Sequence, residues 1–175
     1  MADVRTRIQT VAHVNGYLPP DVRVSRKLCE GGQGIVFEGH VFQERAAVKI
    51  YLPGQNATRI DREVNVMKQL RCDAVVRALW SGSVAVDGED LPVVATQLLP
   101  GEPLDKALSQ RRLTEDQIWT VVYDVADAIQ NLWKLRIVHR DLKPSNVILL
   151  PTGRCCVIDL GLARHLDQSS LRACR

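Results

Sequence analysis

The stretch from His139 to Asn146, which reads HRDLKPSN, most constrains what this chain can fold into. It follows a long amphipathic segment and precedes two short apolar runs, Val147–Leu150 and Cys155–Ile158, with Pro-Thr-Gly between them. Apolar runs bounded in this way predict two strands joined by a tight turn. Asn146 lies directly before the first strand and Asp159 directly after the second, so we expect both at one end of a hairpin.

The polar residues of this region have a defined chemistry. Asp141 and Asp159 supply carboxylates, Asn146 an amide and Lys143 an ammonium group, all on predicted loops. Carboxylate and amide oxygens are ligands for Mg²⁺, and a lysine beside them neutralises phosphate oxygens. The set indicates a site that holds a metal-bound triphosphate beside a hydroxyl.

A glycine-containing turn is expected nearer the N-terminus. Val22–Leu28 alternates apolar and polar residues, which predicts a strand, and it runs into a segment that contains Gly31 and Gly34. Glycines let backbone N–H groups approach phosphates closely. By itself the run is weak evidence, and an ordinary hairpin turn is the alternative.

Lys49 and Glu63 form a second predicted pair. Lys49 lies in an apolar strand, Arg45–Tyr51, where an unpaired ammonium group is costly. Glu63 lies beside the apolar stripe of a predicted helix that begins at Asn56 or Thr58 and ends near Leu70. The alternatives are an edge lysine that reaches solvent and a solvated helical glutamate.

Taken in order, these motifs resemble a eukaryotic-type protein kinase of the serine/threonine class. HRDLKPSN and Asp159-Leu160-Gly161 match the catalytic and metal loops, Ala46–Lys49 resembles the V-A-I-K strand, and Gly31, Gly34 and Val36 match the glycine loop. Cys29 replaces the first loop glycine, and Gln33 stands where a bulky residue is common.

The resemblance implies an α+β, protein-kinase-like fold. It has a five-stranded N-lobe sheet with one helix, over residues 22–96, and a hinge with a partial, mainly helical C-lobe over residues 97–175. Residues 1–21 are left as an N-terminal leader, either a short helix or a flexible segment.

The resemblance also implies the cofactors ATP and Mg²⁺ and a role for each matching residue. The catalytic set is Asp141, Lys143, Lys49 and Glu63, and the metal ligands are Asn146 and Asp159. The nucleotide-binding set is Cys29, Gly31, Gly34, Val36, Ala47, Lys49, Thr96, Gln97, Leu99 and Ile148, in which Thr96 is the gatekeeper and Gln97–Leu99 the hinge.

One long helix is predicted between the hinge and HRDLKPSN. Thr114 to Gln117 reads as a capping box. The apolar stripe behind it is Ile118, Val122, Val125, Ile129 and Leu132, and the polar face is Asp124, Asp127, Asn131 and Lys134.

The kinase family continues past Gly161 through an activation segment and further helices, so the long helix is expected to expose an apolar face. Three alternatives follow: a minimal enzyme completed by a partner or by a second copy, a nucleotide-binding pseudokinase module, and an inactive fragment. The expected substrate of an active enzyme is a protein hydroxyl.

The composition is that of an ordinary globular protein, with 46% hydrophobic and 25% charged residues. A net charge of +3, spread along the chain, argues against a nucleic-acid surface, and no apolar run suggests a membrane span. The five cysteines form no C-x-x-C pair, which favours reduced thiols and a cytoplasmic location.

Overall fold

The computed structural model describes residues 4–70, 72–110, 113–160 and 164–165. The chain divides into two compact units. The first comprises the described parts of Met1–Asn65 and Arg77–Leu98, and the second those of Val66–Val76 and Leu99–Arg175. Gly161 of the Asp159-Leu160-Gly161 motif and Cys174, one of the five cysteines, lie outside the described residues.

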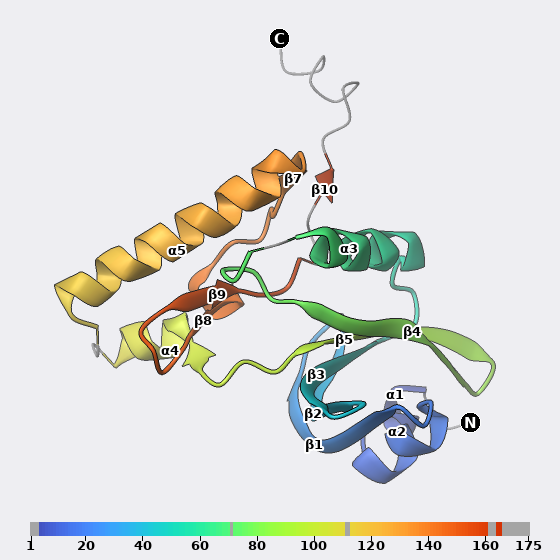
Figure 1. Cartoon of the computed structure of the whole chain (residues 1–175). Coiled ribbons are helices and arrows are strands. Elements are labelled where there is room, and N and C mark those ends of the chain that lie inside the picture. The colour runs from blue at the N-terminus through green and yellow to red at the C-terminus, as the bar shows by residue number, and fades with distance from the viewer. Residues whose placement is uncertain (1–3, 71, 111–112, 161–163, 166–175) are drawn as a thin grey trace. The chain divides into compact units, whose positions relative to one another are not determined.

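The first unit is built on a five-stranded antiparallel sheet in the order β1-β2-β3-β5-β4 (Figure 1). Its strands are β1 (Val22–Glu30), β2 (Gly34–Val41), β3 (Glu44–Tyr51), β4 (Ala78–Val86) and β5 (Glu89–Gln97). The expected five-stranded sheet is confirmed. The apolar pattern before β5 favours two short strands, Val75–Leu79 and Trp80–Val86. This interpretation is wrong, because Ala78–Val86 is one strand and Val75 pairs with Val157 within the second unit.

The two faces of β3 have different environments. Ala46, Val48 and Ile50 belong to a buried apolar cluster, whereas the alternate residues Lys49 and Tyr51 point to the other face. The alternation therefore places the apolar core on one face of β3 and the polar side chains of Lys49 and Tyr51 on the other.

Residues of the predicted leader complete this core. Two short helices, α1 (Val4–Arg7) and α2 (Val11–Tyr17), lie beside β1 (Figure 1), and Ile8, Val14 and Leu18 are buried in the cluster. Asn15 fixes α2 to β1, because its side-chain amide donates to Val24 O and accepts from Val24 N, both at 2.8 Å. Of the two interpretations of this segment, the structure has the helical one.

The predicted helix after the third strand is α3 (Ala57–Gln69). The Asn56 side chain accepts a hydrogen bond from Arg59 N at 3.0 Å, so the expected cap at Asn56 is confirmed. Ile60, Val64 and Met67 are buried at the predicted helical spacing, and Glu63 is buried with them.

The second unit contains two helices, a short 3-10 turn and small antiparallel sheets. The order β6-β8-β9 forms one sheet and β10-β7 the other. The elements are β6 (Glu102–Pro103), α4 (Leu104–Ser109), α5 (Glu115–Lys134), β7 (Ile137–Val138), η1 (Pro144–Asn146), β8 (Val147–Leu149), β9 (Cys155–Val157) and β10 (Arg164–His165). The predicted β8–β9 hairpin and the Thr114–Gln117 capping box are both present.

The apolar stripe of α5 is largely exposed at Ile118, Val122 and Ile129, as expected, whereas Leu132 is buried together with Ala128. The departure is Asp124, which was expected on the polar face and is buried. Asp124 is buried because its carboxylate accepts from Arg154 Nε at 2.9 Å and from Cys155 N at 2.6 Å. A carboxylate that looked solvated in the sequence thus attaches the helix to β9.

Cys155 and Cys156, at the start of the predicted strand Cys155–Ile158, are both buried. Burial raises the pKa of the Cys155 thiol to about 11 and that of Cys156 to about 12, which keeps both protonated at neutral pH. Within the described part of the chain, no helix has the length and apolar composition needed to cross a membrane.

Candidate active site

The second unit brings Asp141, Lys143, Asn146 and Asp159 to one end of the β8–β9 hairpin, and we refer to these four residues as the loop cluster. Asp141 accepts hydrogen bonds on Oδ2 from Lys143 Nζ at 2.8 Å and from Asn146 Nδ2 at 3.0 Å. Lys143 lowers the pKa of the Asp141 carboxyl below its ordinary value, and Asn146 adds to this effect. Asp141 is therefore ionised at neutral pH and can accept a proton.

Lys143 experiences the reciprocal effect. The hydrogen bond with Asp141 raises the pKa of its ammonium group, and the charge of Asp159 acts in the same direction. Lys143 therefore carries a permanent positive charge next to both carboxylates. An ammonium group in this position can neutralise phosphate oxygens.

Asn146 and Asp159 are joined through the backbone. Asn146 ends η1 and Asp159 follows β9, and Ile158 N donates to Asn146 O at 2.9 Å. The side-chain amide nitrogen of Asn146 donates to both O and Oδ2 of Asp141. These bonds use both amide hydrogens and leave the amide oxygen to act as a ligand. An amide oxygen and the Asp159 carboxylate fit Mg²⁺, which takes few protein ligands and completes its shell with water and phosphate.

Left-handed backbone conformations shape these loops. Arg140 has φ 67° and Asp159 has φ 59°, values that side chains other than glycine adopt infrequently. His139 is buried next to Arg140 in the sequence. Its Nε2 donates to Ile158 O, and its Nδ1 accepts from Asp141 N, both at 3.3 Å. His139 thus connects the segment that contains Asp141 to the segment that leads to Asp159.

The first unit groups Gln33, Lys49, Tyr51 and Glu63, which we call the β3–α3 cluster. Lys49 Nζ donates to Gln33 Oε1 at 3.2 Å and lies 4.6 Å from the centre of the Tyr51 ring. The Tyr51 hydroxyl donates to Glu63 Oε2 at 3.3 Å. Lys49 and Glu63, matched from the sequence, are thus brought into one group by Tyr51.

The glycine loop is the turn between β1 and β2. Gly31 N donates to Gly34 O at 2.9 Å, and Leu52 N donates to Gln33 O at 2.9 Å. A Cβ at Gly34 would collide with the Ile50 carbonyl oxygen, whereas at Gly31 it would meet open space. The close approach of β2 and β3 therefore suffices to explain Gly34. Cys29, at the predicted first-glycine position, is an exposed free thiol.

Several predicted nucleotide-binding residues share the sheet face of Lys49. Val36 lies directly opposite Lys49 on β2, and Thr96 lies opposite Ala47 on β5. The hinge N–H groups of Gln97 and Leu98 donate to Arg77 O and Arg45 O. Among the described residues no backbone acceptor is found for Leu99 N, so this group suits an adenine edge. Leu99 and Ile148 belong to the second unit, where Ile148 is half-buried in β8.

The sequence patterns did not single out Tyr51, Asp124 or Arg154. The available signal for Tyr51 was the period of two along β3, which places it on the face of Lys49. Asp124 gave no such signal, because its partner Arg154 lies on a turn 30 residues away. The contact between the Gln33 side chain and Lys49 likewise depends on how the hairpin folds back.

Comparison with known proteins shows the family to which the chain belongs. The protein kinase domain model matches residues 22–174. The chain is 35% identical over 162 residues to inhibitor of nuclear factor kappa-B kinase subunit beta of Bos taurus, covering 85% of this chain and 21% of that protein. It is 36% identical over 138 residues to the alpha subunit of Gallus gallus, covering 73% and 18%.

A more distant relative belongs to the same family. Serine/threonine-protein kinase pakA of Dictyostelium discoideum is 32% identical over 148 residues, covering 81% of this chain and 12% of that protein. The chain thus spans about a fifth or less of the length of these relatives. Since the family model covers most of the sequence and the motifs fall on the described site elements, the chain belongs to the protein kinase family.

Proposed function

We propose that this chain is the ATP- and magnesium-dependent catalytic part of a serine/threonine protein kinase. The observation that carries the proposal is the geometry of Asp141, whose carboxylate is held by both Lys143 and Asn146. An ionised carboxylate, oriented beside a lysine and a metal-binding amide, is what transfer of a phosphoryl group to a hydroxyl requires. The curated relatives named as kinases support the same class.

In the proposed reaction, the oxygen of a protein serine or threonine attacks the γ-phosphorus of ATP, and the bond to the β–γ bridging oxygen breaks to release ADP. Asp141 orients the hydroxyl and takes its proton, while Lys143 neutralises the transferred group. Asn146 and Asp159 hold Mg²⁺, which when bound supplies charge neutralisation for the phosphate oxygens.

The remaining residues bind the nucleotide. Lys49, supported by Glu63, contacts the α- and β-phosphates, and the turn that contains Gly31 and Gly34 covers them. Val36, Ala47 and Ile148 sandwich adenine, and the backbone of the hinge from Gln97 to Leu99 bonds its edge next to Thr96. Cys29 borders the same turn. These roles follow the family motifs, and the shared sheet face of Val36, Ala47 and Lys49 supports them.

The test is phosphoryl transfer from γ-labelled ATP to serine-, threonine- and tyrosine-containing peptides. We expect magnesium-dependent label on serine or threonine, lost in Asp159→Asn. Asp105→Asn, on exposed α4, is the matched control and keeps full transfer. Label that does not depend on magnesium, or that Asp159→Asn retains, would contradict the metal assignment.

The transfer assay, combined with thermal unfolding, separates the alternatives. A pseudokinase module would bind Mg·ATP, which raises the unfolding midpoint, but would not transfer phosphate. An inactive fragment would show neither. The intact Asp141 favours an enzyme, because a module that only binds nucleotide has no need of a proton acceptor at that position.

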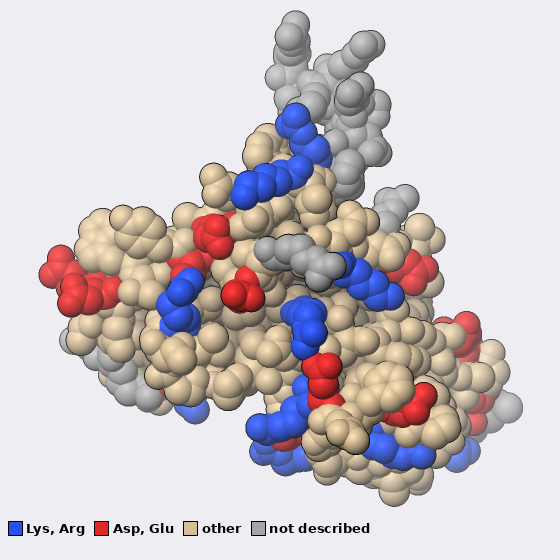
Figure 2. Space-filling model, in the orientation of Figure 1, with Lys and Arg blue, Asp and Glu red and all other residues tan. Residues whose placement is uncertain are grey.

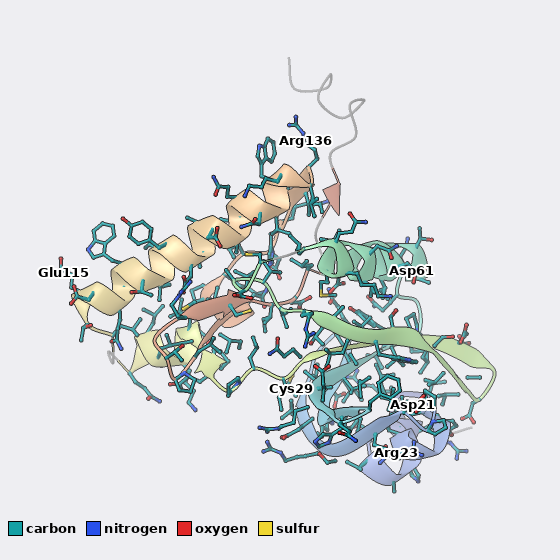
Figure 3. The ribbon with its side chains drawn as sticks, viewed as in Figure 1. Asp21, Arg23, Cys29, Asp61, Glu115 and Arg136 are labelled. Carbon is teal, nitrogen blue, oxygen red and sulfur yellow. The ribbon has the colours of Figure 1, made fainter. Side chains whose placement is uncertain are left out.

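We further propose that another protein surface, a partner or a second copy, covers the outer face of α5. Its members are 45–74% exposed and comprise Ile118, Trp119, Val122, Tyr123, Ile129 and Trp133. Figure 3 shows ring side chains standing off this helix between the labelled Glu115 and Arg136. An apolar patch of this kind is a common feature of interaction sites. Double substitution of Trp119 and Tyr123 by glutamate should remove any concentration-dependent association in sedimentation experiments.

The charge distribution and the thiols bear on partners and location. On the face shown in Figure 2, Lys and Arg side chains are interspersed with Asp and Glu rather than gathered into one basic patch of the kind that binds nucleic acid. The free thiols of Cys29, Cys72, Cys155 and Cys156 support a reducing, cytoplasmic location.

As domain boundaries we propose residues 22–96 for the N-lobe and 97–175 for the hinge and partial C-lobe.

A further inference from the structure

Tyr51 is a buried tyrosine with two contacts to functional groups. It lies two residues after Lys49 on β3, on the same face of the sheet, and its side chain is 3% exposed. Its hydroxyl donates to Glu63 Oε2 at 3.3 Å, and its ring lies 4.6 Å from Lys49 Nζ. One side chain therefore contacts both members of the pair that is expected to hold the nucleotide phosphates.

The two contacts are chemically complementary. The phenol hydroxyl is a hydrogen-bond donor for a carboxylate that is 7% exposed and so has little access to water. The ring face is an electron-rich surface that attracts an ammonium group. Tyr51 can therefore hold a carboxylate with one end and a cation with its face, and it connects α3 to β3 in doing so.

We propose that Tyr51 is a positioning residue for phosphoryl transfer, one that orients Glu63 and Lys49 without itself touching the nucleotide. This inference rests on the proposed function. Glu63 lies on α3 and Lys49 on β3, so their relative position depends on how the helix attaches to the sheet. The hydrogen bond from the Tyr51 hydroxyl fixes the orientation of the Glu63 carboxylate, and the ring limits where the Lys49 ammonium group can lie.

Gln33 gives this arrangement a functional consequence. Lys49 Nζ donates to the Gln33 side chain at 3.2 Å, and an ammonium group has three hydrogens, so it can bind a phosphate in addition to this contact. The Tyr51 ring limits the positions that the ammonium group takes in doing so. Tyr51 is thus expected to affect the alignment of bound ATP more than the affinity for it.

The first experiment compares Tyr51→Phe with Tyr17→Phe, which also deletes a hydroxyl in the first unit. Tyr17 is partly buried on α2, against the opposite face of the sheet. For Tyr51→Phe we expect kcat to fall about tenfold with the KM for ATP within about twofold, since an oriented bond to a charged group is lost. For Tyr17→Phe both constants should stay at the wild-type values.

A double-substitution cycle shows whether Tyr51 acts through Glu63. If it does, Tyr51→Phe combined with Glu63→Gln loses no more kcat than Glu63→Gln alone. Losses that multiply would overturn the inference. So would a Tyr51→Phe enzyme that is less stable but has wild-type kcat and KM, because the role of the hydroxyl would then be structural only.

Failure of the proposed function gives a different result. In that case the wild-type chain itself transfers no phosphate, and the wild type and the four variants are unfolded with and without Mg·AMP-PNP, a non-hydrolysable ATP analogue. The inference then requires that the effects of Tyr51→Phe and Glu63→Gln on the unfolding midpoint are coupled, and that the analogue raises the midpoint of Tyr51→Phe nearly as much as that of the wild type. Independent effects, or no shift with any of the proteins, would overturn it.

Discussion

The two clusters of candidate site residues are held in different ways. In the β3–α3 cluster, Lys49 and Glu63 stand on a strand and a helix, and side-chain contacts of Tyr51 connect them. In the loop cluster, Asn146 and Asp159 flank a hairpin, and a backbone hydrogen bond from Ile158 to Asn146 connects their segments. The comparison shows that a strand and a helix carry the β3–α3 cluster, whereas irregular loops carry the loop cluster.

The difference has a physical consequence. A hairpin fixes the ends of its strands, so the distance between Asn146 and Asp159 is set by the backbone. The separation of Lys49 and Glu63 is set by the packing of α3 on the sheet, and a single side chain can change it. We therefore expect the β3–α3 cluster to be the adjustable part of the site and the loop cluster the fixed part.

The largest expected effect is in the loop cluster. Asp141→Asn removes the proton acceptor, and we predict a loss of transfer of about 10²- to 10⁴-fold, the usual contribution of general base catalysis. Mg·ATP binding should remain, because the metal ligands Asn146 and Asp159 are untouched. Single-turnover transfer and calorimetric binding measure the two quantities, with Asp105→Asn as control. Unchanged transfer would remove Asp141 from the mechanism.

The hairpin that fixes the loop cluster depends on Asp124. Asp124→Ala leaves Cys155 N and the Arg154 guanidinium without their acceptor, and we predict a loss of about 1–3 kcal/mol in the free energy of unfolding. Denaturant unfolding measures this loss, and Asp116→Ala on the exposed first turn of α5 should change stability much less. Equal effects of the two substitutions would show that β9 is not held through α5.

The adjustable part is tested by Gln33→Ala. Removal of the amide that accepts from Lys49 leaves that ammonium hydrogen for phosphate, so we predict a decrease of about two- to fivefold in the Kd for Mg·ATP. Calorimetric titration gives the value, and Gln43→Ala, in the exposed turn before β3, is the control. Weaker binding in Gln33→Ala would instead mean that Gln33 contacts the nucleotide.

The smallest expected effect lies outside both clusters, at the end of β1. Hydrogen bonds from Lys27, Arg5 and Gln9 lower the pKa of Glu30 from 4.5 to about 2. A carboxyl whose pKa is lowered by folding stabilises the fold above its unfolded pKa, and this contribution is lost as the pH falls from about 4.5 towards 2.

Glu30→Gln should therefore lower the unfolding midpoint slightly at pH 7 and flatten its decline between pH 4.5 and 2. Thermal unfolding at a series of pH values measures both changes, and Glu89→Gln on β5 is the control. An identical pH profile in Glu30→Gln and the wild type would mean that these contacts do not persist in solution.

The sequence predicted the parts of the site that depend on local order. Asn146 and Asp159 flank two short strands, so one hairpin suffices to bring them together, and Asn56 begins α3 through its own side chain. The attachment of α5 could not be predicted in the same way. Its orientation depends on the contact of Asp124 with Arg154, which pairs a helix residue with a turn distant in the sequence. The sequence alone also does not distinguish a buried aspartate from a solvated one.

The same reasoning applies to the β3–α3 cluster. The residue types of Lys49 and Glu63 indicated their chemistry, but the position of Tyr51 between them depends on the packing of α3 on β3. Gln33 was noted only as a departure from the family pattern, because nothing local shows that its side chain reaches Lys49. The roles of all these residues in nucleotide binding stay predictions.

The most direct test of the proposed function, in which both clusters would bind one nucleotide, is calorimetric titration of Mg·AMP-PNP into the wild type, Lys49→Met and Asp159→Asn. We predict one binding site in the wild type and a loss of at least about tenfold in affinity for each variant, since each removes a charged contact to the same ligand. Wild-type affinity in either variant would contradict the claim and leave the nucleotide to the other cluster alone.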